Sequence, residues 1–497
     1  MEINKLSYNY CYAIIVIVLS MCNVEAQTKH YFSGIPRNIF LIQNSNQLEL
    51  NKRTISKIHP NHTHTYNVEL EQDQFLQVVV EQKGIDVLIK LYSPDKALLS
   101  EFDGHTGTWG IDKVSWIAKV KGNYTIEIVY NNNNAEEGEY EVYIKELRNQ
   151  TVADKRFVEA EKLFMQASKL REKSDKTFFE NIIKQYSDSI SIYNELKDIF
   201  MVAQINSSIG QVYSELNDYE KSLRYHAIAL SEYQKGGYLH GEATEFSNLG
   251  TLYDLVNEKE KSIFYNQKAL SIYTSLGDKK SQIILKNNIA YGYDSLAKKN
   301  DALKYYLECL DDIDKTNFET LKATILSNVG VLYGDIGDTT NALISHTEAL
   351  KIYAKKELKR EKAITLSNIG IIYDNLGEQE EALKRYDEAI FLFEEVGSAI
   401  GKAKAQVNKA VIFVQQKQFD KSKELYESAL EVFKKTNNKN GEGSTLTKIA
   451  ELYLELNEYN KAIERLNHAL TLRQSINDRY GEAQTLLLLG KTNFLAH

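Results

Sequence analysis

The sequence predicts a mainly α-helical protein, a right-handed α-solenoid with a 40-residue period that follows a small antiparallel β-sandwich. Three observations lead to this prediction. A short motif recurs at every fortieth position from 210 to 490, and a fixed period of this length indicates stacked structural repeats. Each repeat contains two stretches with apolar residues at helical spacing. Residues 27–148 instead hold short alternating stretches rich in β-branched and aromatic residues.

Residues 241–280 illustrate one repeat. The first half has apolar residues at helical spacing and ends at a polar break around Asn257. The second half repeats the helical pattern, and Gly277 follows it as a natural C-cap. Each repeat is therefore predicted to be a helix–turn–helix hairpin. Residues 152–497 are expected to hold eight helix pairs and a final unpaired helix.

Small residues recur at three positions of each repeat, and an aromatic residue recurs at a fourth. A small side chain lets two helices approach closely, because nothing larger fits where their axes cross. We expect the aromatic residue to fill the wider gap between neighbouring repeats. The small columns are Gly210, Gly250, Ala290, Gly330, Gly370, Ala410, Ala450 and Gly490; Ser222, Ser262, Ala302, Ala342, Ala382, Ser422 and Ala462; and Ala229, Ala269, Cys309, Ala349, Ala389, Ala429 and Ala469. The aromatic column is Tyr213, Tyr253, Tyr293, Tyr333, Tyr373, Phe413 and Tyr453.

This spacing resembles that of the tetratricopeptide repeat family over about residues 154–497, with Gly followed by an aromatic residue at +3 and small residues at +12 and +19. The 40-residue period is similar to that of the longer-helix repeats in kinesin light chains and Leu-Gly-Asn repeat proteins. The resemblance implies a solenoid in which these columns pack the helices and carry no chemistry.

The composition argues against several functions. The net charge is −8 with both signs interspersed, whereas a nucleic-acid-binding protein would present a basic face. We therefore expect no nucleic acid partner. The sequence has no Gly-rich phosphate loop, metalloprotease motif or serine elbow. We expect no small-molecule cofactor, no metal and no catalytic activity within this chain.

Residues 1–26 have the pattern of a secretory signal peptide. Lys5 precedes an apolar core at 13–19 that is too short to span a bilayer, and small residues precede a cut before Gln27. An uncleaved anchor and lipidation at Cys22 are the alternatives. We expect an exported protein, periplasmic or extracellular, that is attached to a membrane only if this segment is retained or Cys22 is lipidated.

The three cysteines are too few for a disulfide framework. Cys11 and Cys22 lie in the signal-like segment, so the mature chain would keep only Cys309. Cys309 stands in a small-residue column, and no His lies near it in sequence. We interpret it as a packing residue, because a catalytic thiolate needs a His within reach.

Residues 27–148 are predicted to form the antiparallel β-sandwich. Seven short runs have strand character, and turn residues such as Gly84 and Gly122 separate them. Strands at this spacing are typical of a sandwich, and the stretch 48–58 is expected to add one more. The seven runs are Thr65–Leu70, Phe75–Glu81, Asp86–Tyr92, Ala97–Phe102, Val114–Val120, Tyr124–Tyr130 and Tyr140–Leu147.

Residues 46–165 resemble the bacterial pre-peptidase C-terminal-like sandwich, through the runs FLQVVVEQKGIDVLIKLYSPDKALLSEFD, GNYTIEIVY and GEYEVYIKEL. In one bacterial family this sandwich stands directly before a tetratricopeptide array, and members of that family commonly end in a caspase-like CHAT peptidase domain. One departure is Lys96, where a turn Gly is usual after Pro-Asp. The resemblance implies that this chain is similar to the non-catalytic part of such a protein.

Two clusters in the sandwich region carry metal-ligating side chains. His59, His62 and His64 lie within six residues, and imidazoles bind transition metals, but no Cys or acidic partner completes the set nearby. Asp86 and Asp103 have the hard carboxylate oxygens that suit calcium. We favour a solvated loop for the histidines, and strand-end and turn roles for the aspartates.

The two tryptophans, Trp109 and Trp116, could form a platform on which a sugar stacks. Both lie within or just before one predicted strand. We favour packing roles, with one tryptophan buried and the other exposed.

One polar column is the candidate binding site. Asn recurs two residues before the first small position in five successive repeats, although Asn is a poor helix former and each copy costs about a few tenths of a kcal/mol. Amides in line on the inner, concave face can hydrogen-bond the N–H and C=O groups of an extended peptide, a role that the resemblance also implies. The alternative is that they bond the adjacent helix and fix the stacking. The column comprises Asn248, Asn288, Asn328, Asn368 and Asn408.

The predicted function is an exported interaction scaffold that binds a protein or extended peptide in the concave groove of the repeats. The alternatives are the recognition half of a longer CHAT-type peptidase, with its catalytic part beyond His497, and the sensor half of a signalling protein. The last helix, from about 481, is apolar on more than one face. We expect further chain, a partner or a second copy to cover it.

Overall fold

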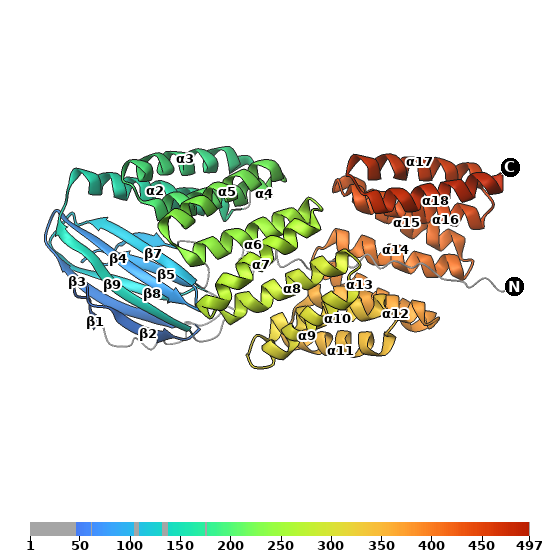
Figure 1. Ribbon diagram of the computed structural model, residues 1–497, viewed down its shortest axis with the longest axis horizontal. Coiled ribbons are helices and arrows are strands. Elements are labelled where there is room, and N and C mark those ends of the chain that lie inside the picture. The colour runs from blue at the N-terminus through green and yellow to red at the C-terminus, as the bar shows by residue number, and fades with distance from the viewer. Residues whose placement is uncertain (1–45, 61, 104–108, 132–137, 174–175, 497) are drawn as a thin grey trace. The chain divides into compact units, whose positions relative to one another are not determined.

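The computed structural model describes residues 46–60, 62–103, 109–131, 138–173 and 176–496. Strands come first and helices follow in tandem, which confirms the predicted fold class (Figure 1). The described residues divide into two compact units, a first unit that ends at Tyr305 and a second unit that begins at Tyr306. The signal-like segment 1–26 lies outside the described residues.

Nine strands in the described part of the chain form two sheets. They are β1 (Asn46–Gln47), β2 (Thr54–Ile58), β3 (Thr63–Leu70), β4 (Gln74–Lys83), β5 (Val87–Tyr92), β6 (Leu98–Phe102), β7 (Trp109–Ile117), β8 (Gly122–Tyr130) and β9 (Gly138–Asn149). The first sheet has the order β1-β3-β8-β5-β6 and the second has the order β2-β9-β4-β7. Neighbouring strands are antiparallel except β1 and β3, which are parallel.

The seven predicted strands correspond to β3–β9, and β2 lies within the eighth predicted stretch. The largest difference in a strand end is at β7, which begins at Trp109 rather than Val114. Pairing with β4 extends β7, because Trp109 lies opposite Lys83 in the ladder. Lys96 has a φ of 66°, the left-handed conformation that Gly usually supplies, so this turn forms with Lys in place of Gly.

Seventeen α-helices follow in the described residues. They are α2 (Val152–Arg171), α3 (Phe179–Glu195), α4 (Ile199–Glu215), α5 (Tyr219–Gly236), α6 (Leu239–Leu255), α7 (Lys259–Leu276), α8 (Lys279–Ser295), α9 (Lys299–Ile313), α10 (Glu319–Asp335), α11 (Thr339–Lys355), α12 (Lys359–Asn375), α13 (Gln379–Glu395), α14 (Ala399–Gln415), α15 (Phe419–Lys435), α16 (Lys439–Glu455), α17 (Tyr459–Ser475) and α18 (Arg479–Ala496), with a short 3-10 helix η2 (Lys176–Phe178) before α3. Gly277 is the left-handed C-cap of α7, with a φ of 74°, as predicted. Asn257 takes the same conformation at the polar break, with a φ of 62°.

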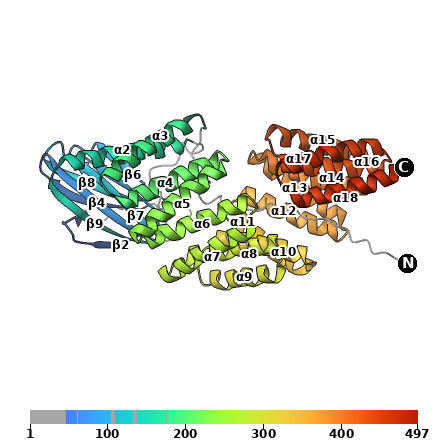
Figure 2. The same cartoon turned by 45° about the horizontal axis from the view of Figure 1, so that its top comes forward.

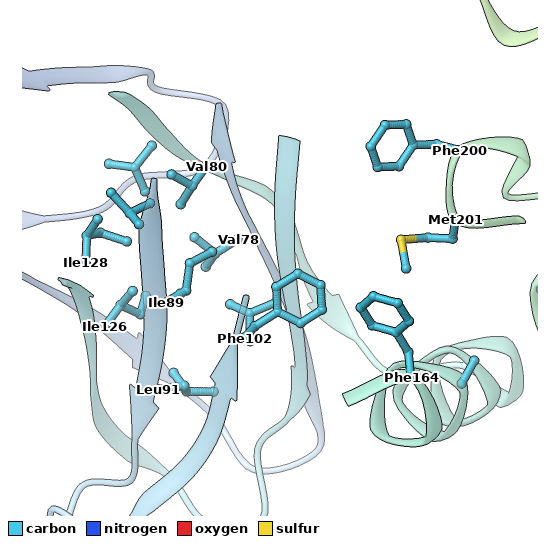
Figure 3. Packing of buried hydrophobic residues seen from close by; sticks show 14 of the residues in the cluster. Val78, Val80, Ile89, Leu91, Phe102, Ile126, Ile128, Phe164, Phe200 and Met201 are labelled. Atoms are coloured by element: carbon cyan, nitrogen blue, oxygen red, sulfur yellow. The ribbon is translucent and has the colours of Figure 1, made fainter. Parts of the chain in front are cut away.

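The sandwich core continues into the first helices. Figure 3 shows Val78 and Ile89 packed between the sheets, with Phe102 on the side where Phe164 of α2 lies. The centroid of the Phe102 ring lies 6.1 Å from that of Phe164, which lies 5.7 Å from that of Tyr186 in α3. The sandwich and the first helix pair therefore share one hydrophobic core.

Helix α2 covers the edge strand β7, as the two cartoon views show (Figure 1, Figure 2). An edge strand exposes unpaired backbone groups that can recruit other strands. The buried carboxylate of Glu161 in α2 accepts a hydrogen bond of 2.9 Å from the backbone N–H of Ser115. Beside it, Lys113 of β7 forms an ion pair of 3.5 Å with Asp198. The solenoid thus satisfies a backbone donor that the sheet leaves unpaired.

The Gly column forms sockets for large side chains. A Cβ added to Gly330 would lie 2.8 Å from the ring of His346, and one added to Gly370 would lie 2.7 Å from the ring of Tyr386. Each ring belongs to the following helix of the same pair. The other two small columns are buried throughout. The prediction that small residues mark close helix contacts is therefore confirmed.

The aromatic column packs differently from the prediction at its first members. Tyr213 and Tyr253 are half-buried and stack on Tyr225 and Tyr265, with ring centroids 5.4 Å and 5.2 Å apart. Both partners come from the second helix of the same pair, so these rings do not simply fill a gap between repeats. The reason is that the second helix places another tyrosine within stacking distance.

Candidate functional site

The candidate site lies on the first helices of the helix pairs. Within the first unit α4 contacts α6, and within the second unit α10 contacts α12, α12 contacts α14 and α14 contacts α16. Each unit therefore contains a row of first helices. Asn248 of α6 and Asn288 of α8 belong to the first unit, whereas Asn328 of α10, Asn368 of α12 and Asn408 of α14 belong to the second.

Asn248 is tied into a buried polar network. Its amide Nδ2 lies 3.3 Å from Oε1 of Glu245, which also accepts a hydrogen bond of 2.6 Å from the hydroxyl of Ser207 in α4. The other oxygen, Oε2, lies 2.7 Å from Nδ1 of His226 in α5. Three helices thus meet at the carboxylate of Glu245, whereas the contact of Asn248 itself lies within α6 and reaches the neighbouring helices only through Glu245.

Asn288 makes a local contact. Its Oδ1 accepts a hydrogen bond of 3.4 Å from the amide of Asn287, the preceding residue on α8. This contact does not join two helices, and the side chain of Asn288 remains half-buried. It retains the capacity to donate to a ligand.

Two members of the column in the second unit have amides without a partner among the described residues. Asn368 is 8 % exposed and Asn408 is half-buried, and neither side chain hydrogen-bonds another described residue. Asn328, by contrast, has an interaction within the chain. Because these two amides make no hydrogen bond within the described chain, Asn368 and Asn408 are the members of the column best suited to bind a ligand.

A charged residue on α14 was missed by the sequence reasoning. Lys404 stands one helical turn before Asn408 and so lies on the same face of the helix. Burial lowers the pKa of Lys404, and its ammonium forms no ion pair with any described residue. The equivalent positions on α10 and α12 hold Thr324 and Ile364. This break in the repeat pattern was the signal that could have identified Lys404.

Asp374 of α12 is, like Lys404, a half-buried charged residue of this unit. Burial raises the pKa of Asp374, while a hydrogen bond from Gln415 of α14 and the charge of Lys448 on α16 act in the opposite direction. Its Oδ1 atom is buried without a hydrogen-bond partner among the described residues. The first helices of the second unit therefore carry two charged side chains, Lys404 and Asp374, that the other described residues neutralise only in part.

The metal candidates of the sandwich have protein partners. The amide of Asn131 lies 2.9 Å from Oδ2 of Asp103 and 3.3 Å from Oδ2 of Asp86, so the two aspartates converge on one side chain. Nδ1 of His64 lies 2.7 Å from the hydroxyl of Tyr140, and burial lowers the pKa of this histidine. In the described ranges, His, Cys, Asp and Glu form no group of three that could hold a metal ion.

The tryptophan prediction is wrong in part. Trp109 and Trp116 are both half-buried, rather than one buried and one exposed. Trp109 stacks on His240 of α6, with ring centroids 6.2 Å apart, and the Nε1 atom of Trp116 is buried without a hydrogen-bond partner among the described residues. The contact of Trp109 with α6 joins segments far apart in the chain, so spacing in the sequence does not reveal it. Cys309 is fully buried, as predicted for its column.

No helix in the described part of the chain combines the length and apolar character needed to cross a membrane. The apolar core of the signal-like segment lies outside the residues to which this finding applies.

Comparison with known proteins identifies the repeats. Residues 321–395 and 401–475 each match the family model for the tetratricopeptide repeat. No curated protein matches the sequence of the chain. The apo form of the quorum sensor NprR from B. thuringiensis has a similar fold, with a TM-score of 0.52 at 18% identity over 64% of this chain and 88% of that one.

Two further structures are similar at lower scores. Aspartyl phosphate phosphatase F from Bacillus subtilis has a TM-score of 0.48 at 13% identity and covers 63% of this chain and 84% of its own. The Rap conjugation gene regulator of plasmid pLS20, in complex with the Phr* peptide, has a TM-score of 0.46 at 15% identity and covers 65% and 93%. At these identities the likeness concerns the fold alone. Residues 321–395 and 401–475 are tetratricopeptide repeats, and a β-sandwich and further helices in tandem precede them in the chain.

Proposed function

We propose that the chain is an exported binding scaffold, without catalytic activity of its own, whose repeats hold an extended peptide or protein segment. The observation that supports this proposal is the pair of amides at Asn368 and Asn408, which lack partners among the described residues. Asn destabilises a helix interior, so its recurrence there fits a role that the helix itself does not require.

The chemistry of this surface suits a peptide backbone. An Asn amide presents a donor and an acceptor together, and so matches the N–H and C=O groups of an extended chain whatever its side chains are. Lys404, next to Asn408, adds an ammonium that can pair with a carboxylate of the ligand. We therefore propose an extended peptide with an acidic group as the ligand of the second unit.

A library of displayed random peptides can test this proposal, because the natural ligand is not needed. Peptides enriched on the chain are synthesised, and their affinity is measured by calorimetry for the wild type and for Asn368→Ala/Asn408→Ala. We expect at least about tenfold weaker binding, or about 1.4 kcal/mol. The melting temperature should stay the same or rise, because Ala is the better helix former.

The control variant is Asn248→Ala, from the same column. Its amide contacts Glu245, so this change should lower stability and leave peptide affinity unchanged. The proposal fails if no peptide is enriched over an unrelated helical protein. It also fails if the double variant binds as tightly as the wild type.

Export is a separate part of the proposal and rests on the pattern of residues 1–26. The intact mass of protein recovered from the host that makes it should correspond to a chain that starts at Gln27. A mass that retains residues 1–26 would contradict export with cleavage. A mass that begins at an acylated Cys22 would indicate a lipoprotein on a membrane surface.

A second candidate function is recognition within a longer CHAT-type peptidase. The presence of a β-sandwich directly before the repeats favours it over the sensor half of a signalling protein. The coding sequence beyond His497 tests this candidate. An open frame of some hundreds of residues with a His and a Cys after separate strands would support it, and an immediate stop codon would exclude it.

A further inference from the structure

A buried carboxylate joins α4, α5 and α6 of the first unit. Glu245 of α6 is 1 % exposed, and its carboxylate accepts a hydrogen bond of 2.6 Å from the hydroxyl of Ser207 in α4. The same carboxylate lies 2.7 Å from Nδ1 of His226 in α5 and 3.3 Å from the amide of Asn248. A hydroxyl, an imidazole and an amide therefore surround one carboxylate, and the chain itself supplies that carboxylate.

The second unit repeats these three side chains without the carboxylate. Ser, His and Asn stand at the equivalent positions of α10, α11 and α12, three repeats further along the chain, at Ser327, His346 and Asn368. The position of this His holds Tyr, Asn or Leu in the other repeats. The position of the carboxylate is taken by Thr365, whose hydroxyl donates a hydrogen bond of 2.9 Å to the carbonyl of Glu361 on its own helix. Thr365 thus does not supply the missing acceptor.

His346 occupies the same place in its helix pair as His226. A Cβ added to Gly210 would lie 2.7 Å from Nε2 of His226, and a Cβ added to Gly330 would lie 2.8 Å from Nε2 of His346. In both pairs Nδ1 is therefore the ring nitrogen that lies farther from the glycine. In the first unit this atom meets the carboxylate. In the second unit it is buried without a hydrogen-bond partner among the described residues.

The other two groups of the set are also unpaired. Ser327 and Asn368 are each 8 % exposed, and neither side chain hydrogen-bonds another described residue. Burial alone lowers the pKa of His346 to about 4, so no charged group of the described chain acts on that ring. A hydroxyl, an amide and an Nδ1–H can all donate to one carboxylate. In each unit the three helices contact one another, which brings the three groups together.

We propose that Ser327, His346 and Asn368 bind a carboxylate of the ligand, at the position that Glu245 fills in the first unit. This inference rests on the proposed peptide-binding function and names the side chain that the peptide contributes, an aspartate or a glutamate. A side chain is needed because the ring of His346 is 1 % exposed, so a carboxylate must extend from the peptide backbone to reach it. This carboxylate site is separate from Lys404, which lies on α14.

Sodium formate tests the carboxylate site without knowledge of the natural ligand. The NMR signal of Cε1–H in His346 is assigned in the full chain by its absence from His346→Asn. It should shift saturably with formate and stay unchanged with sodium chloride at the same ionic strength. Thr365→Glu should not respond to formate, because this variant fills the site from its own chain. A wild-type His346 signal that does not respond to formate overturns the proposal.

Two substitutions of Thr365 test whether the three groups accept a carboxylate. Thr365→Glu should raise the pKa of His346, since a nearby negative charge favours the imidazolium. Thr365→Gln has the same size without the charge and should leave that pKa low. Thermal unfolding checks that both variants are folded, and the formate titration of the wild type decides the question if they are not. The proposal fails if the pKa of His346 is as low in Thr365→Glu as in Thr365→Gln.

Peptides enriched on the chain by display test the source of the carboxylate. Exchange of one Asp or Glu of the peptide for Asn or Gln should weaken binding at least about tenfold, or about 1.4 kcal/mol. Thr365→Glu should weaken binding of the parent peptide by a similar factor and leave that of the exchanged peptide unaffected. Amidation of the peptide C-terminus should not change the affinity, and a loss on amidation would contradict a side chain as the source.

The outcomes separate this inference from the proposed function. Peptides that bind equally well after every such exchange overturn the carboxylate site and leave peptide binding standing. If no peptide is enriched, peptide binding fails, and the formate titration still decides whether the carboxylate site exists.

Discussion

Glu161→Gln is the substitution that most directly tests how the sandwich and the helices are joined. Glu161 is buried, and desolvation raises its pKa from the ordinary 4.5 to about 8, although the Ser115 N–H and the charge of Lys113 oppose this effect. Gln keeps the acceptor oxygen for the Ser115 N–H and cannot ionise. The substitution therefore removes the titration and retains the hydrogen bond.

The expected magnitude follows from proton linkage. Because the folded chain holds a proton on Glu161 more tightly than the unfolded chain does, stability is fully present below about pH 4.5 and is lost as the pH rises to about 8. The slope is at most about 1.4 kcal/mol per pH unit, which amounts to on the order of 5 kcal/mol over this interval. Glu161→Gln should match the wild type near pH 4.5 and exceed it in stability above pH 8.

Tryptophan fluorescence during urea unfolding is the appropriate assay, since both tryptophans of the chain lie on β7, the strand that carries Ser115. Midpoints are measured from pH 4.5 to pH 9 for the wild type, Glu161→Gln and the control Glu159→Gln, whose carboxyl is exposed on the same helix. The control should follow the wild type. The reasoning is refuted if Glu161→Gln and the wild type show the same dependence on pH, or if the variant is the less stable protein at pH 9.

The remaining predictions concern the sockets of the second unit. Gly330→Ala should destabilise the chain by about 1–3 kcal/mol, because its Cβ would meet the His346 ring. Gly334→Ala on the same helix meets nothing within 4 Å and should stabilise the chain by up to about 1 kcal/mol. Equal melting temperatures for the two variants would contradict the close contact at Gly330. Burial lowers the pKa of His346 to about 4. Between about pH 6.5 and pH 4 this histidine is therefore protonated in the unfolded chain and neutral in the folded chain. Stability should fall as the pH drops through this range. His346→Asn, which copies Asn266 beneath Gly250, should remove this fall in thermal unfolding followed by circular dichroism, and an unchanged dependence on pH would argue against it.

The sequence alone determined the elements and their order, because these depend on residues close together in the chain. A helix of this array is specified by apolar residues at intervals of three and four, and its end by a residue such as Gly277 that accepts a positive φ. The 40-residue period then repeats that local specification. Strands were found to within a few residues for the same reason, except where pairing with β4 extended β7 to Trp109.

The tertiary structure alone decided which side chains meet across elements. Glu161 and Ser115 are 46 residues apart, and nothing in the spacing of either segment indicates that one accepts a hydrogen bond from the other. The Asn column shows the same limit, because equivalent positions in successive repeats have different neighbours. Asn248 contacts Glu245, three residues earlier on its own helix, while Asn408 has no partner in the described chain and stands one turn from the unpaired Lys404. A repeat pattern specifies the position of an amide, whereas only the tertiary structure shows that its neighbour Glu245 also binds Ser207 of α4 and His226 of α5, because those contacts join different helices.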